Sequence, residues 1–132
     1  MRVLAISGLL IAAGWSAHAE TDAAQATILN QIEAFRADDF EQAFGFASPG
    51  IRMQFGTAET FGKMVRNGYP MVYRPADVTM LDQRQSGGFL VQRVMITDQQ
   101  GRGHLLDYQM TETPDGWRIN GVWPVPSEGP GV

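Results

Sequence analysis

Residues 89–110, which read FLVQRVMITDQQGRGHLLDYQM, decide the fold of this chain because they describe one β-hairpin. Apolar and polar side chains alternate on both sides of Gln99-Gln100-Gly101, a pattern typical of two strands. The three-residue loop fits a type I turn closed by a glycine in the left-handed region, and this geometry determines which residues face each other. It predicts three cross-strand pairs, which are Asp98 with Arg102, Arg93 with Asp107, and Val94 with Leu106.

A second hairpin follows directly along the chain. Pro114-Asp115-Gly116 fits the same type of loop and places Glu112 opposite Arg118. Opposite charges across both ladders favour these registers by about 0.2–1 kcal/mol for each pair. With the glycine-bearing turn before residue 88, the pattern predicts four strands near residues 77–85, 88–98, 102–112 and 117–123.

The predicted registers sort the side chains of the sheet into two faces, and both faces are apolar. The first carries Val78, Met80, Leu90, Val94, Ile96, Leu106, Tyr108, Met110 and Val122. The second carries Leu81, Phe89, Val91, Met95, Leu105, Trp117, Ile119 and Trp123, with Arg93 and Asp107 between them. Because one helical layer covers only one face, we expect a second copy of the chain to cover the other, as a homodimer.

The sequence leaves open which face the helices take. The favoured dimer interface is the second face, with Phe89, Val91, Trp117, Ile119 and Trp123 as its candidate residues. The alternative interface is the face of Met80, Val94 and Tyr108.

Before the strands, apolar residues recur at helical spacing. Asp22 and Gln25 resemble a capping box, and a first helix is predicted over about residues 23–37 with Ile28, Ile32 and Phe35 on its apolar face. Asp39 is the predicted N-cap of a second helix, which Ser48-Pro49-Gly50 ends. Thr57 is the predicted cap of a third, ending at Asn67-Gly68.

The first nineteen residues have the pattern of a secretory signal peptide. Arg2 is basic, residues 3–13 are apolar, and Ala17-His18-Ala19 has the small side chains that signal peptidase accepts. Cleavage between Ala19 and Glu20 predicts a periplasmic or secreted protein. The apolar run is too short for a membrane anchor, which takes roughly 20 residues.

Composition excludes several function classes. The formal net charge of −4 becomes −5 without Arg2, which argues against nucleic acid and anionic membranes as partners. The chain has no cysteine, and without His18 its one remaining histidine is His104, so we expect no disulfide, no metal site and no cofactor. The 113 residues that cleavage would leave suit one domain over residues 20–123, followed by a Pro- and Gly-rich irregular tail over residues 124–132.

Three segments carry a resemblance to a known family. Residues 35–44 (FRADDFEQAF) resemble the helix–Asp–helix junction of the nuclear transport factor two-like or ketosteroid-isomerase-like (SnoaL-like) superfamily, and residues 115–119 (DGWRI) resemble its closing hairpin. With Phe46-Ala47-Ser48-Pro49 between them, the chain looks closest to the exported family called domain of unknown function 4864. The resemblance implies an α+β fold in which three N-terminal helices pack on a curved antiparallel sheet, a cystatin-like or nuclear transport factor two-like roll.

Few residues are candidates for chemistry. Asp107 is a possible base oriented by Arg93, and Asp38 lies beside Asp39 at a helix junction, but ion pairing and capping are the ordinary roles of such residues. Candidates for lining a ligand pocket are Tyr69, Tyr73, Met80 and Tyr108.

Two functions remain open after these observations. The favoured one is a non-catalytic binding or accessory domain that holds a small apolar ligand or contacts another envelope protein. The alternative is an isomerase- or cyclase-like enzyme with an acid–base residue in the cone between helices and sheet. Steroid isomerases place a tyrosine in their first helix, where this chain has Phe35.

Overall fold

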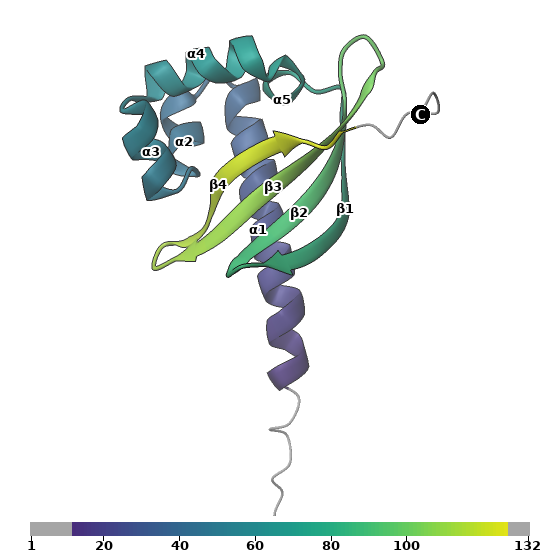
Figure 1. Ribbon diagram of the computed structural model, residues 1–132. Helices are drawn as coiled ribbons and strands as arrows, with labels where there is room; N and C mark the ends of the chain where they lie inside the picture. Colours follow the sequence, from purple (N-terminus) through teal and green to yellow (C-terminus); the bar gives the residue numbers. More distant parts are fainter. Residues whose placement is uncertain (1–11, 127–132) are drawn as a thin grey trace, which may run out of the picture.

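The computed structural model describes residues 12–126, with side chains from residue 22 onward. Figure 1 shows α1 running along one face of an open four-stranded antiparallel sheet, with the shorter helices gathered around one end of α1 beside β4. The fold is therefore α+β, as predicted. The helices are α1 (Ala12–Arg36), α2 (Phe40–Gly45), α3 (Pro49–Phe55), α4 (Ala58–Gly68) and α5 (Pro70–Tyr73), and the strands are β1 (Asp77–Ser86), β2 (Phe89–Thr97), β3 (Gly103–Thr113) and β4 (Gly116–Pro124).

The helical half has more elements than predicted, because three helices were expected and the described residues form five. Asp39 caps α2 by accepting a bond from the Gln42 amide, and Thr57 caps α4, so both predicted caps are confirmed. Ser48 was wrongly interpreted as part of a stop signal. Its side chain accepts from the Ile51 amide and Pro49 occupies the first turn, so Ser-Pro starts α3.

The first helix begins earlier than predicted, at Ala12 instead of near residue 23, and it passes through the predicted cleavage junction. The earlier part of the predicted signal peptide, residues 1–11, lies outside the described residues. So does the end of the predicted tail, residues 127–132.

Helix α1 covers the face of the sheet that carries Met80, Val94 and Tyr108. Ile28, Ile32 and Phe35 on α1 are almost completely buried, and they belong to one core with the inward side chains of the strands. The structure therefore answers the question that the sequence left open. The opposite face, with Phe89, Val91 and Arg93, is the outer face of the sheet.

The register of the β2–β3 hairpin is as predicted. Arg93 faces Asp107 and Val94 faces Leu106, while the Asp98 amide donates to the Arg102 carbonyl. Gly101 closes the turn at a φ of 87°, in the left-handed region that glycine adopts without a Cβ penalty.

The register of the β3–β4 hairpin differs from the prediction near the turn. Thr113 pairs with Gly116 across a two-residue loop, so Arg118 faces Thr111 and Trp117 faces Glu112. The predicted pair of Glu112 with Arg118 is therefore wrong, because Gly116 belongs to the ladder instead of closing the loop.

An irregularity in β4 then restores the predicted register. Between Ile119, which faces Met110, and Gly121, which faces Gln109, Asn120 is an extra residue. Trp117 and Ile119 consequently lie on the helix-covered face, whereas Trp123 lies opposite Asp107 on the edge strand, where its side chain also lines a cavity beside β4. Two of the five predicted interface residues thus belong to the core side.

One edge of the sheet contacts the helical layer directly. Ala47 forms a parallel bridge with Ile119, whose amide donates to the Phe46 carbonyl and whose carbonyl accepts from the Ser48 amide. This contact holds the chain between α2 and α3 against β4 and positions α3 beside the strand.

Gln92 is a fully buried polar residue within the core face. Its Oε1 accepts bonds from Gln25 on α1 and Gln83 on β1, and its Nε2 donates to the carbonyls of Leu81 and Arg93. The Leu81 carbonyl lies in the irregular part of β1 between Met80 and Gln83, where it accepts from Gln92. Both the oxygen and the nitrogen of this buried amide therefore have hydrogen-bond partners.

Candidate functional site

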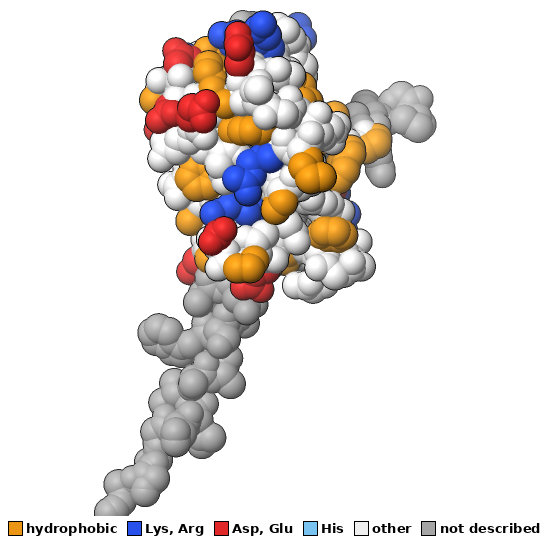
Figure 2. Space-filling model, turned by 90° about the vertical axis from the view of Figure 1, so that its left-hand side faces the viewer, with side chains coloured by type: hydrophobic (Ala, Val, Ile, Leu, Met, Phe, Trp, Pro, Cys, Tyr) orange, Lys and Arg blue, Asp and Glu red, His pale blue; other side chains and the backbone are white. Residues whose placement is uncertain are grey.

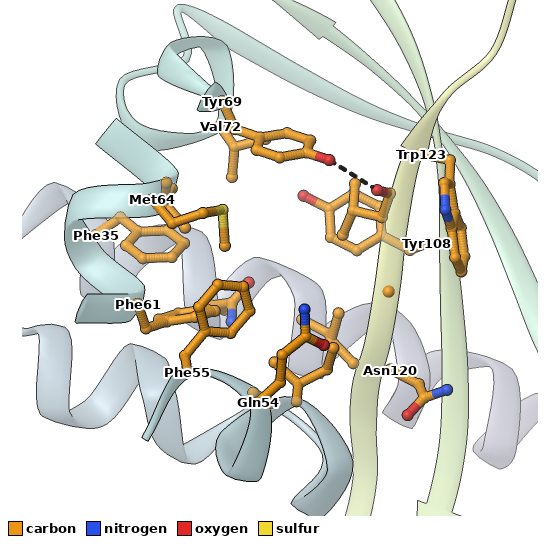
Figure 3. A pocket seen from close by; sticks show the side chains of 17 residues that line it. Phe35, Gln54, Phe55, Phe61, Met64, Tyr69, Val72, Tyr108, Asn120 and Trp123 are labelled. Carbon is orange, nitrogen blue, oxygen red and sulfur yellow. Dashed lines mark hydrogen bonds between the residues drawn. The ribbon is translucent and has the colours of Figure 1, made fainter. Parts of the chain in front are cut away.

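A cavity of about 360 Å³ lies between the helices and strands β3 and β4. Figure 3 shows its walls, with Phe55 and Gln54 from α3, Phe61 and Met64 from α4, and Tyr108 from the sheet. None of the described residues that line it has a charged side chain. Its surface is mainly aromatic and aliphatic, with polar groups from Gln31, Gln54, Tyr69, Tyr108 and Asn120.

Phe61 organises the helical wall of the cavity. Its ring centroid lies 5.3 Å from that of Phe44, 5.8 Å from that of Phe55 and 6.0 Å from that of Phe35. Aromatic pairs at these separations attract one another beyond their buried area. Residues from α1, α2, α3 and α4 therefore meet at one side chain, which gives this wall a defined shape.

Most polar groups of the cavity wall already have partners. Tyr69 Oη donates to the Val122 carbonyl at 3.0 Å, and Gln31 Nε2 donates to the Ala43 carbonyl at 3.0 Å. Asn120 Nδ2 donates to Gln109 Oε1 at 2.8 Å. These bonds connect the cavity wall to neighbouring elements and stabilise its shape.

Tyr108 differs from these residues. Its side chain is completely buried, and its Oη has no hydrogen-bond partner within the described part of the chain. Burial raises the pKa of the Tyr108 phenol far above its usual value, so the group stays protonated at physiological pH. In Figure 3 the hydroxyl of Tyr108 points into the cavity, near the end where Tyr69 reaches Val122.

The four residues predicted to line a pocket are only partly brought together. Tyr69 and Tyr108 both line this cavity. Tyr73 lies outside it, where its ring stacks on Phe40 with centroids 6.1 Å apart. Met80 packs against the core from β1.

The predicted pair of Arg93 and Asp107 forms on the outer face, away from the cavity. Arg93 Nε lies 2.9 Å from Asp107 Oδ1, and a second guanidinium nitrogen lies 3.1 Å from Oδ2. This two-point contact lowers the pKa of Asp107, so the carboxyl group is ionised and engaged by its neighbour. Such a group is a weak general base.

The side chain of Asp38 also forms hydrogen bonds within the protein. Asp38 adopts a φ of 55°, and its Oδ1 accepts bonds from Tyr73 Oη and from Arg74, whose guanidinium nitrogen lies 3.0 Å away. The hydrogen bond from Tyr73 contributes most to lowering the pKa of Asp38, and the hydrogen bond from Arg74 lowers it further. Asp38 therefore links the α1–α2 junction to α5.

His104 is paired at the β2–β3 turn. Its Nε2 lies 2.9 Å from Asp98 Oδ2, while Asp98 Oδ1 accepts from the amides of Gln100 and Arg102. The hydrogen bond from His104 contributes most to lowering the pKa of Asp98. This cluster fixes the turn.

Sequence reasoning missed several residues of the cavity wall, among them Gln31, Gln54, Phe55 and Asn120. Gln31 had a detectable signal, because it follows Ile28 by three residues and therefore interrupts the apolar face of α1 with an amide. Gln54 and Phe55 belong to α3, which was not predicted. Asn120 is the extra residue in β4, and in Figure 3 its side chain points away from the centre of the cavity.

Three comparisons with known proteins bear on the family. The family model described as a domain of unknown function, DUF4864, matches residues 17–132. Comparison with curated proteins gives no match, and comparison with solved structures gives none either. Since the family model matches most of the sequence, the chain belongs to the DUF4864 family.

Proposed function

We propose that this protein is an exported, non-catalytic domain that binds a small, uncharged, apolar molecule in the cavity between helices and sheet. One observation carries the proposal: the cavity has an aromatic and aliphatic lining, and the described residues around it contribute no charge. Its volume of about 360 Å³ falls within the range of about 300–1,000 Å³ that is common for small-molecule sites. The fold, with helices preceding a meandering sheet, supports membership of the nuclear transport factor two-like superfamily.

The positions of the titratable residues support binding over catalysis. Asp107 and Arg93 lie on the outer face, and Asp38 lies at the α1–α2 junction, so these candidates are not among the described lining residues. Tyr108 is the buried titratable group that the cavity offers, and its raised pKa makes it a poor base. The isomerase- or cyclase-like alternative therefore has less support.

A fluorescent probe tests the binding proposal. N-phenyl-1-naphthylamine is uncharged at neutral pH and becomes brighter when it leaves water. We expect saturable binding, weakened at least tenfold by Ile51→Trp, because Ile51 lines the cavity and a larger side chain would fill it.

Met53→Trp on the same helix is the matched control, since Met53 is 81% exposed and does not line the cavity. Circular dichroism checks folding, and Gln54→Trp replaces Ile51→Trp if that variant unfolds. Equal probe affinity in the cavity variant and in Met53→Trp would contradict binding in this cavity.

We further propose that the chain forms a homodimer through the outer face of the sheet. Phe89, Met95, Leu105 and Trp123 surround the Arg93–Asp107 pair there, and Trp123 is 50% exposed, whereas Val91 is already buried within the single chain. By contrast, Figure 2 shows that on the side where α2 and α3 lie, apolar side chains are separated by charged and polar ones. An envelope protein is the alternative partner for the outer face.

Export is proposed from the N-terminal sequence pattern alone. Among the described helices, none has the length and apolarity that crossing a membrane requires.

A further inference from the structure

Among the buried polar groups of the cavity wall, the hydroxyl of Tyr108 is the one that the described residues do not satisfy, whereas the Gln54 amide is exposed to solvent. Tyr69, Gln31 and Asn120 donate to other parts of the chain, whereas Tyr108 Oη is buried without a hydrogen-bond partner in the described residues. Buried polar groups are hydrogen-bonded in the great majority of cases, because an unmet group loses its hydration without compensation. An unsatisfied hydroxyl at a cavity wall is a candidate donor to a bound molecule, which would have to displace the side chains that now cover Tyr108 Oη.

We infer that the ligand carries an uncharged oxygen acceptor, such as a ketone carbonyl, and that Tyr108 Oη donates a hydrogen bond to it. This inference rests on the proposed function and specifies the chemical class of the ligand. The phenol is the donor, because the buried group retains its proton. The acceptor is uncharged, because a carboxylate in this cavity would lose its hydration without meeting a positive side chain from the described lining.

The shape of the cavity also orients the ligand. In Figure 3 the hydroxyls of Tyr69 and Tyr108 lie toward one end, and Phe55, Phe61 and Met64 form the wall on the side of α3 and α4. The Tyr69 hydroxyl already donates its proton to the Val122 carbonyl, so it does not compete with Tyr108 as a donor to the ligand. The oxygen of the ligand therefore lies at the Tyr108 end, and its apolar body lies against the phenylalanines.

Two probes of nearly equal shape test this inference. 2-Acetylnaphthalene carries a ketone, and 2-isopropenylnaphthalene has a methylene group in place of the oxygen. Each is titrated against the wild-type protein, Tyr108→Phe and the matched control Tyr69→Phe. For each protein we divide the affinity for the ketone by the affinity for the hydrocarbon. The readout is the quotient of the wild-type ratio and the ratio of the variant, because this double comparison cancels the different hydrophobicity of the two probes.

For Tyr108→Phe we expect a quotient of roughly tenfold, which corresponds to about 1.4 kcal/mol. For Tyr69→Phe we expect a quotient near one. The carbonyl stretching band of the bound ketone should lie at lower frequency in the wild type than in Tyr108→Phe, since a hydrogen bond weakens the C=O bond. 2-Naphthoate, the charged analogue, should bind at least tenfold more weakly than the ketone.

The possible failures are distinguishable. If both neutral probes bind, but the Tyr108 quotient is within twofold of one, the inference is overturned and cavity binding stands. A preference that follows Tyr69 instead of Tyr108 also overturns it. If neither neutral probe binds the wild type, both the inference and the proposed function fail.

Discussion

Removing the Tyr108 hydroxyl should stabilise the unliganded protein. Tyr108→Phe keeps the buried ring and deletes an oxygen that has no partner in the described chain. Burying a hydroxyl without a hydrogen bond costs about 1–3 kcal/mol in proteins. The void left by one oxygen atom costs about 24 cal/mol per Å³, well below 1 kcal/mol in total. We therefore expect the free energy of unfolding to rise by about 1–2 kcal/mol, and Tm to rise by about 4 °C for each kcal/mol.

The matched control is Tyr69→Phe, the same chemical change at a hydroxyl that donates to the Val122 carbonyl. This variant should be less stable than the wild type by about 0.5–1.5 kcal/mol, the net value of one hydrogen bond. Urea unfolding followed by circular dichroism measures both variants. If Tyr108→Phe loses stability as Tyr69→Phe does, the Tyr108 hydroxyl has a partner in the unliganded protein and the reasoning is refuted.

Four further predictions concern other parts of the chain. Arg93 lowers the pKa of Asp107, so the stability from this pair is present above the unfolded-state pKa of about 3.9 and is lost as the pH falls through the lower folded-state pKa. Stability measured by urea unfolding from pH 5 to pH 2 should accordingly fall less steeply in Asp107→Asn than in the wild type. Because φ at residue 38 is positive, Asp38→Ala should be less stable than Asp38→Gly by about 1 kcal/mol in denaturant titrations, since both variants lose the hydrogen bonds from Tyr73 and Arg74; equal losses would contradict this strain argument. Sedimentation equilibrium at micromolar concentration should show a dimer for the wild type and a monomer for folded Trp123→Glu, and a monomeric wild type would exclude the homodimer. Intact-mass measurement of the exported protein should give a chain that begins at Glu20, whereas a mass that includes the first nineteen residues would exclude cleavage.

The strands could be predicted well because their signals are local. Turn residues and alternation lie within a few positions of the pairs they determine, so Arg93 was placed opposite Asp107 correctly. At the second hairpin the same reasoning failed near Gly116, because a glycine with positive φ occurs both at the end of a loop and as the first residue of a ladder. The extra residue Asn120 has no local signal in the sequence, and it decides on which faces Val122 and Trp123 lie.

The cavity could be predicted much less well. Its wall combines residues from helices and strands that are far apart in sequence, and their convergence depends on how α3 and α4 pack beside the sheet. Tyr69 and Tyr108 were selected as polar aromatics, but Phe55 and Gln54 require knowledge of α3. Residue type alone could not show that the Tyr108 hydroxyl lacks a partner, because that property depends on what every neighbour already binds.

The contacts along the edge of β4 have a consequence for aggregation. An edge strand with free backbone groups can recruit a strand from another molecule, and chains without disulfides have no covalent protection when they partly open. Here the amide and carbonyl of Ile119 are paired with the segment between α2 and α3, the Val122 carbonyl accepts from Tyr69, and Pro124 has no amide hydrogen to offer. Growth of the sheet by strand addition is thus obstructed at three points along this edge, which disfavours edge-to-edge assembly through β4.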